Sequence, residues 1–191
     1  FFFKRNAGES GMDQLSLMCR DTDFPPMSLD IYATPGAKIK VTGTNPLIYT
    51  WRVDSPVKEQ QEHNRFIEDS RDLWDEFQRL AIKERSMRSA SEAERKALRT
   101  KSDSISSIIN QRELKLMKEL PISNVWMEKL LRLSMSLKYN SRFTNKEEIL
   151  ALYDRLNEEQ KASIEGQEIR VNLFPPKTVK EGDDMADADL F

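Results

Sequence analysis

Two long amphipathic patterns follow one another in this chain, separated only by a short polar segment. The first covers residues 56–88 and the second covers residues 91–120. Apolar side chains recur at helical spacing in both, and Ser91 and Glu94 fit a capping box at the start of the second. Because the polar segment between them is short, we predict an antiparallel helical hairpin with arms about 45 Å long.

The loop position also predicts which residues of this hairpin face one another. With the reversal centred near Ser89, Leu73 is expected opposite Ile105, and Leu80 opposite Leu98. Apolar residues become rarer toward the loop while charged residues become more frequent. We therefore expect the tip to be the least stable part of the hairpin.

The first part of the chain shows the alternation of apolar and polar residues that is typical of short strands. This alternation is found over residues 15–19 and 29–33. Residues 35–56 then predict a β-hairpin, with one strand around Val41, a Gly- and Pro-containing turn, and a return strand over residues 47–53. Together these segments predict a small sheet or sandwich that leads directly into the first long helix.

The part that follows the hairpin predicts further helices and a final strand. A third helix is expected over residues 122–139, and a fourth begins near Thr144 and is interrupted at Asn157. Gly166 is expected to end the helical region. Apolar and polar residues alternate again over residues 168–174, which predicts a strand that returns to the N-terminal sheet.

These patterns together predict an α+β fold in which strands precede helices. The expected parts are a β-rich unit over 1–55, a helical hairpin or bundle over 56–165, a closing strand over 166–176, and an acidic tail or the start of a further domain over 177–191. The first residue is Phe rather than Met, which predicts either a removed leader or a longer chain.

The composition offers little material for catalysis. Among 191 residues there is one histidine, His63, and one cysteine, Cys19, so neither an internal disulfide nor a His/Cys metal site is available. We therefore predict a non-enzymatic protein without cofactor or small-molecule substrate. No apolar run approaches the roughly 20 residues of a membrane span. Several aromatic residues are interpreted as core rather than as a ligand cleft; they are Tyr49, Trp51, Trp74, Phe77 and Trp126.

The tip of the predicted hairpin is rich in basic residues, and five of them are candidate phosphate contacts: Arg85, Arg88, Arg95, Lys96 and Arg99. The formal net charge of the whole chain is −2, and no aromatic residues lie between these cations to stack on bases. The favoured interpretation is a solvated helix tip, so nucleic acid is the less favoured partner.

The end of the chain resembles a class of short peptides that bind sliding clamps in bacterial replication proteins. The residues that carry the resemblance are Asp187, Asp189, Leu190 and Phe191, which also resemble the acidic tips of single-stranded-DNA-binding proteins. Both resemblances imply an aromatic anchor on an acidic tether. If the chain continues beyond residue 191, Leu190 and Phe191 instead begin another strand.

A second resemblance lies in the predicted β-hairpin. Residues 35–41 read PGAKIKV and residues 44–49 read TNPLIY. This resembles uncharacterised bacterial envelope proteins, in which a strand after "PG" is followed by a strand after "TNP" or "NNP" and then by helices. The resemblance implies a periplasmic or extracellular protein. The favoured hypothesis is an interaction or scaffold protein with a protein partner; the alternative is a phage or bacterial DNA-replication accessory protein.

Overall fold

The computed structural model describes residues 13–87, 90–139 and 143–175. Short strands come first and helices make up the rest, which confirms the predicted α+β class. The chain divides into two compact units, and the boundary between Lys129 and Leu130 falls within helix α4 (Asn124–Tyr139). No helix in the described part of the chain has both the length and the apolar character that crossing a membrane requires.

The described strands of the first unit form two separate antiparallel pairs. The strands are β1 (Asp13–Leu17), β2 (Leu29–Ala33), β3 (Lys40–Thr42) and β4 (Arg52–Asp54). Leu15 lies opposite Ile31 in the first pair, and Val41 lies opposite Val53 in the second. A two-stranded sheet is only marginally stable by itself, so both pairs depend on the helices that cover them.

The return strand predicted over residues 47–53 is wrong in its first half. Residues Ile48–Thr50 form a 3₁₀ turn, η1, and only the segment after it pairs as β4. The cause is local, because the Asn45 side-chain oxygen accepts hydrogen bonds from the Leu47 N–H (2.8 Å) and from the Thr50 hydroxyl (3.2 Å). Such side-chain bonding stabilises a turn against an extended strand.

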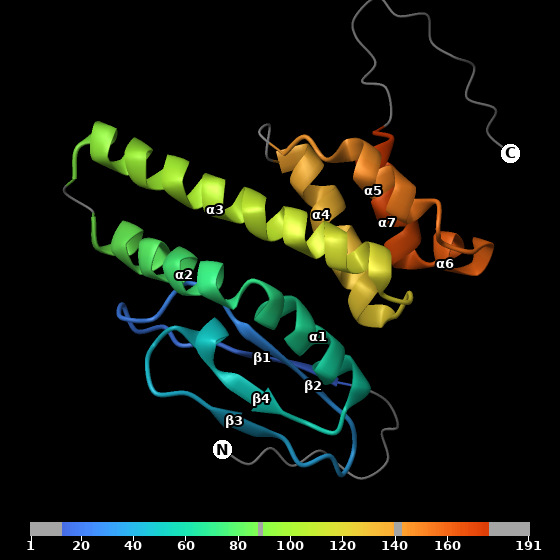
Figure 1. Ribbon diagram of the computed structural model, residues 1–191, viewed down its shortest axis with the longest axis horizontal. Coiled ribbons are helices and arrows are strands. Elements are labelled where there is room, and N and C mark those ends of the chain that lie inside the picture. The colour runs from blue at the N-terminus through green and yellow to red at the C-terminus, as the bar shows by residue number, and fades with distance from the viewer. Residues whose placement is uncertain (1–12, 88–89, 140–142, 176–191) are drawn as a thin grey trace, which may run out of the picture. The chain divides into compact units, whose positions relative to one another are not determined.

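The first long helix is two helices rather than the single one predicted over residues 56–88. They are α1 (Lys58–Asp69) and α2 (Arg71–Ser86), and they meet at the fully buried Ser70. The Arg71 guanidinium donates to the Thr50 carbonyl of η1 (2.6 Å). The break lets α1 pack on β2 and β4 while α2 packs on η1 (Figure 1).

Two buried glutamines join these helices to the strand region. Gln60 of α1 accepts a hydrogen bond from the backbone N–H of Tyr32 in β2 (2.8 Å). Gln78 of α2 accepts from the backbone N–H of Tyr49 in η1 (3.1 Å). Both glutamine side chains are fully buried. Each therefore satisfies a backbone donor that would otherwise be left without a partner away from water.

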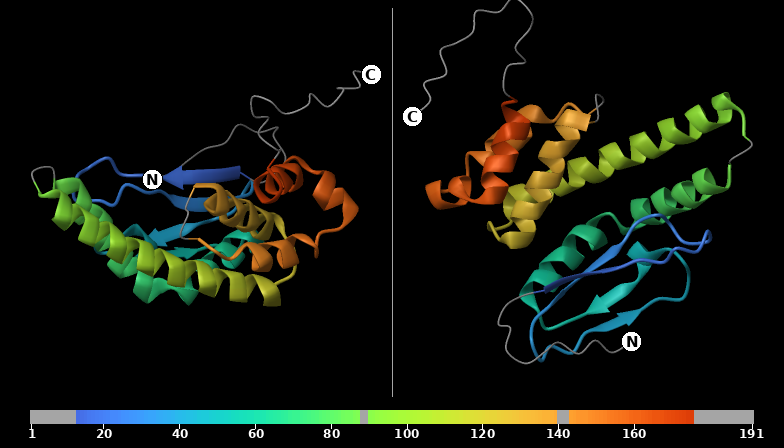
Figure 2. Two further views of the ribbon diagram at one scale, coloured as in Figure 1. Left: turned by 90° about the horizontal axis from the view of Figure 1, so that it is seen from above. Right: turned by 180° about the vertical axis from the view of Figure 1, so that it is seen from behind.

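The predicted hairpin of long helices is confirmed, with α2 running beside α3 (Glu92–Glu119) in every view (Figure 2). The capping box of Ser91 and Glu94 starts α3 as predicted. The buried residues between the two helices are Leu80, Leu98, Ile105 and Ile109, with Leu73, Trp74, Phe77 and Met87 packed against them. Ion pairs cross the edges of this interface from Asp72 to Arg112, from Glu76 to Lys101 and from Glu84 to Arg99.

The second unit contains the rest of α4 and three shorter helices, α5 (Lys146–Tyr153), α6 (Glu158–Ala162) and α7 (Ile164–Leu173). Asn157 caps α6 through a reciprocal bond with Gln160, which confirms the predicted interruption there. The buried apolar side chains among the described residues of this unit are Leu130, Leu133, Phe143, Ile149, Leu152, Tyr153, Leu156, Ile169 and Leu173.

The closing strand predicted over residues 166–176 is wrong, because residues 166–173 belong to helix α7 (Ile164–Leu173). The Ser163 hydroxyl accepts from the backbone N–H of Gly166 (3.1 Å) and begins the helix. Gly166 does not end the helical region. A Cβ at this position would lie 2.1 Å from the backbone oxygen of Gln160, so only glycine lets α6 approach α7 so closely.

Candidate functional site

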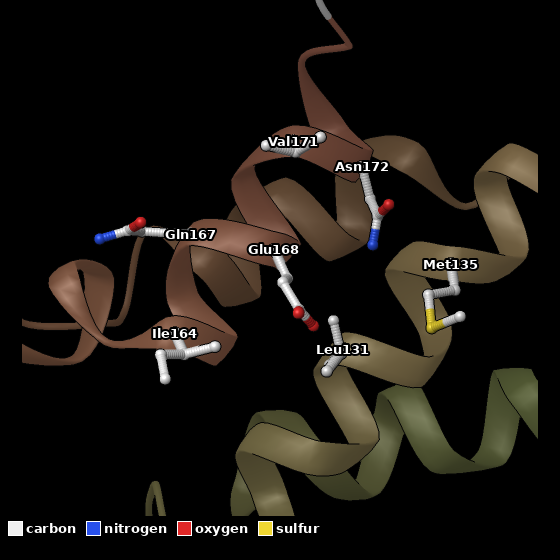
Figure 3. A pocket seen from close by; sticks show the side chains of 7 residues that line it. All are labelled: Leu131, Met135, Ile164, Gln167, Glu168, Val171 and Asn172. Atoms are coloured by element: carbon white, nitrogen blue, oxygen red, sulfur yellow. The ribbon is translucent and has the colours of Figure 1, made fainter.

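An open groove lies between α4 and α7 within the second unit. It has a volume of about 380 Å³ and is mainly apolar. Figure 3 shows the side chains that line it: Leu131 and Met135 from α4, and Ile164, Gln167, Glu168, Val171 and Asn172 from α7. The lining residues thus come from two helices that the chain connects through α5 and α6.

Large apolar side chains are unusually exposed along this groove. Met135 is 44% exposed, Ile164 is 77% exposed and Val171 is 53% exposed, and Phe174 just after α7 is also exposed. Single exposed apolar residues need no explanation, but a contiguous set of them is typical of interaction surfaces. This concentration singles out the groove among the surfaces of the described residues.

Helix α7 supplies one wall because it carries apolar residues on two faces. Ile169 and Leu173, four residues apart, are buried in the core of the unit. Ile164 and Val171, seven residues apart, lie together on a different face and remain exposed. A helix with one apolar stripe can cover its stripe by packing once, whereas α7 keeps its second stripe uncovered.

Helix α4 supplies the other wall in the same manner. Leu130 and Leu133 are fully buried, while Leu131 and Met135, which are four residues apart, line the groove. The methionine side chain is flexible and polarisable, so it adapts to different apolar contacts. Both walls therefore offer apolar side chains at the spacing of successive helical turns.

Polar side chains at the base of the groove fix the separation of its walls. The Asn172 side-chain amide of α7 donates to the Ser134 hydroxyl of α4 (3.0 Å). That hydroxyl in turn donates to the backbone carbonyl of Leu131 (2.7 Å), and Ser134 is fully buried. The Ser134 hydroxyl thus both accepts and donates a hydrogen bond. This chain of two bonds holds α7 against α4 in one arrangement.

One charged residue stands among the apolar lining residues. The Glu168 side chain extends from α7 toward Leu131 on the opposite wall (Figure 3). No cation of the described residues forms an ion pair with this carboxylate. Any group that covers the groove must therefore either leave Glu168 in water or supply a partner for its charge.

The buried polar residues of the first unit form a second cluster, which we interpret as structural. The Tyr32 hydroxyl donates to Glu128 (2.5 Å), and the Tyr32 ring lies 5.4 Å from that of the sole histidine, His63. Burial raises the pKa of the Tyr32 phenol, and the hydrogen bond and negative charge of Glu128 raise it further. The Ser123 hydroxyl donates to Glu62 (2.5 Å). These contacts join β2, α1 and the start of α4.

A smaller hollow of about 200 Å³ lies between β4 and α1. Two of the polar side chains that line it already bond to the backbone. The Asn64 amide donates to the Val53 carbonyl (2.7 Å), and Arg71 donates to the Thr50 carbonyl. We therefore interpret this hollow as a seam between strand and helix.

The predicted basic tip is only partly described, because Arg88 lies outside the described residues. The Arg99 guanidinium forms an ion pair with Glu84 (3.1 Å), and Arg85 donates to the carbonyl oxygens of Asp21 and Phe24. The other two predicted cations, Arg95 and Lys96, are exposed on the first turns of α3. The structure thus gives Arg85 and Arg99 protein partners instead of directing them together toward solvent.

The remaining predicted residues do not form a described site. Asp187, Asp189, Leu190 and Phe191 lie outside the described residues. Aromatic residues of η1 and α2 pack on one another, with Trp74 of α2 edge-on to both Tyr49 of η1 and Phe77 of α2. Across residues 13–87, 90–139 and 143–175, no group of three His, Cys, Asp or Glu side chains is placed to hold a metal ion.

Comparison of the chain with protein-family models, with curated proteins and with solved structures yields no match. The site therefore has to be interpreted from its own geometry. Sequence reasoning missed the groove because it assigned Val171 to a strand. The available signal was the helical spacing of Ile164, Glu168 and Val171, which is hidden by the alternation of residues 169–173.

Proposed function

We propose that this chain is a non-enzymatic interaction protein that docks a protein partner in the groove between α4 and α7. The observation that carries the proposal is the exposure of Met135, Ile164 and Val171 around one open groove. Burying such side chains in an interface contributes about 25 cal/mol for each Å² of apolar surface removed from water.

The shape of the groove favours a macromolecular partner over a small ligand. Pockets for small molecules bury most of the ligand surface and place a few polar groups around it. Here the apolar side chains that form the rim, Met135, Ile164 and Val171, are between 44% and 77% exposed, so a small molecule would stay largely in water. A protein segment covers the rim as well as the floor. The placement in a bacterial envelope implied by sequence resemblance stays a prediction.

The test compares two lysine substitutions at exposed isoleucines. Affinity purification of the tagged chain from cells that produce it should recover a partner that Ile164→Lys loses and Ile108→Lys retains. Ile108 is a matched control because it is exposed on α3, far from the groove lining in sequence. Both variants should keep the helical circular dichroism of the wild type. Recovery of the same proteins with Ile164→Lys would refute the proposal.

A further inference from the structure

The groove contains one feature that specifies the chemistry of its occupant. This is Glu168, a carboxylate that stands among Leu131, Met135, Ile164 and Val171. Covering it with a purely apolar partner would remove from water a charge that has no ion-pair partner among the described residues, which is unfavourable. An occupant that brings a cation to this position instead gains a charge-assisted hydrogen bond.

The spacing of the apolar side chains specifies the shape of the occupant. Ile164 and Val171 are seven residues apart on α7, which corresponds to about 10 Å or two helical turns. Leu131 and Met135 are one turn apart on α4. Two helices that present side chains at these intervals form a trough into which a third helix packs its own residues at i, i+4 and i+7.

We propose that the occupant of the α4–α7 groove is an amphipathic helix of a partner protein, with apolar residues at i, i+4 and i+7 and a lysine or arginine that pairs with Glu168. This proposal rests on the proposed function and names the partner's chemistry. Arginine suits the position well, because its guanidinium can bind both oxygens of a carboxylate while its stem lies on apolar surface.

The same charge argues against a second copy of this chain as the occupant. A two-fold interface centred on the groove would place the Glu168 side chains of both copies close together. Like charges that face one another across an interface are unfavourable and weaken association. The groove also carries no cation of its own among its lining residues that would compensate.

The test is a selection of peptides on the full chain. Phage-displayed random peptides of about 16 residues, long enough for four helical turns, are enriched on the wild type and depleted on the Val171→Lys variant. We expect the enriched sequences to share apolar residues at helical spacing and a basic residue at one fixed position among them. Synthetic versions should become helical on binding.

A charge exchange then tests the role of Glu168. Glu168→Lys should lower the affinity for the selected basic peptide by more than about tenfold, which corresponds to 1.4 kcal/mol. The same variant should bind more tightly a peptide that carries Glu in place of the basic residue. Glu165→Lys is the matched control, since Glu165 is exposed on α7 but does not line the groove. This control should change the affinity by less than about threefold, the scale of surface charge effects.

The outcomes separate this inference from the proposed function. Peptides that depend on Val171 but show no basic residue, or that ignore Glu168→Lys, would overturn the inference and leave the docking proposal standing. Failure to enrich any peptide that depends on Val171 would overturn both. A dimer that Val171→Lys dissociates would assign the groove to a second copy. Binding that rises at least about tenfold on removal of residues 176–191 would assign it to the chain's own end. Either result overturns the inference.

Discussion

The α2–α3 hairpin and the α4–α7 pair are both built from amphipathic helices, yet only the hairpin covers the apolar residues that lie between its two helices. Between α2 and α3 the apolar side chains meet, and ion pairs such as Asp72–Arg112 and Glu76–Lys101 border them. Between α4 and α7 the side chains of Met135, Ile164 and Val171 remain exposed. A helix with one apolar stripe can bury it against a single neighbour, whereas a helix with two stripes leaves the second exposed unless another element covers it.

The largest loss of stability is expected from a substitution in the covered interface between α2 and α3. Ile109→Ala removes a side chain that is 2% exposed between α2 and α3 and should lower the free energy of unfolding by about 2–5 kcal/mol. Urea unfolding followed by circular dichroism measures it. Ile108→Ala is the control one residue away, where a 42% exposed side chain should change stability by less than about 0.5 kcal/mol. Equal losses of stability in the two variants would mean that Ile109 is not more deeply buried than Ile108, which would contradict the described packing of α3 on α2.

The next largest loss of stability is expected where α7 packs closely against α6. Gly166→Ala places a Cβ 2.1 Å from the Gln160 carbonyl oxygen and should cost about 1–3 kcal/mol, since backbone must move to relieve the clash. The neighbouring exposed substitution Gln167→Ala should stay within about 0.5 kcal/mol. Urea midpoints of the two variants check this. A fully stable Gly166→Ala would show that α6 does not need this close approach.

A third prediction tests the polar contacts that close the first unit. The pKa of Tyr32 is raised in the folded chain, so folding retains a proton that the unfolded chain releases above about pH 10. The stabilisation is complete below that pH and is lost as pH rises toward the folded pKa. The stability advantage of the wild type over Tyr32→Phe should therefore shrink by up to about 1.4 kcal/mol per pH unit above pH 10. Urea midpoints between pH 8 and 11 measure it, and a constant difference would contradict the prediction.

The smallest effect is expected at the border of the hairpin. The Arg112 guanidinium lowers the pKa of the exposed Asp72, so their pairing stabilises the fold above the ordinary pKa of aspartate and is lost as pH falls through the lowered value. Because water and salt screen the pair, Arg112→Ala should cost only about 0.2–1 kcal/mol at neutral pH. This cost should decrease in concentrated salt. A loss as large as that of Ile109→Ala would mean that ion pairs, not apolar burial, close the hairpin.

The sequence predicted the elements that follow from one local pattern. It missed the features that depend on contacts with distant residues or on a helix with two apolar faces. The hairpin of α2 and α3 follows from one apolar stripe and from the capping box at Ser91, both visible as fixed spacings. The break at Ser70 was missed because the apolar spacing continues across it, while the contact that accompanies the break runs from Arg71 to the Thr50 carbonyl of η1. That contact depends on residues about twenty positions earlier in the chain.

The error at the closing strand has a physical reason of the same kind. In α7 the buried Ile169 and Leu173 enclose the exposed Val171, and this order imitates the alternation of a strand. No local pattern indicates that Val171 lies on a different face of the helix from Ile169 and Leu173. The groove was therefore not predictable as a site, although Ile164 and Val171 already stand at the spacing that places them on one helical face.

The bonds from Gln60 and Gln78 to the strand region have a consequence for the order in which the chain folds. They link backbone amides of Tyr32 and Tyr49 to side chains 28 and 29 residues further along. During synthesis the strands leave the ribosome first, with the edge amide of β2 still unsatisfied until α1 has been made. The nascent chain thus passes through an interval in which a strand edge is open to other chains.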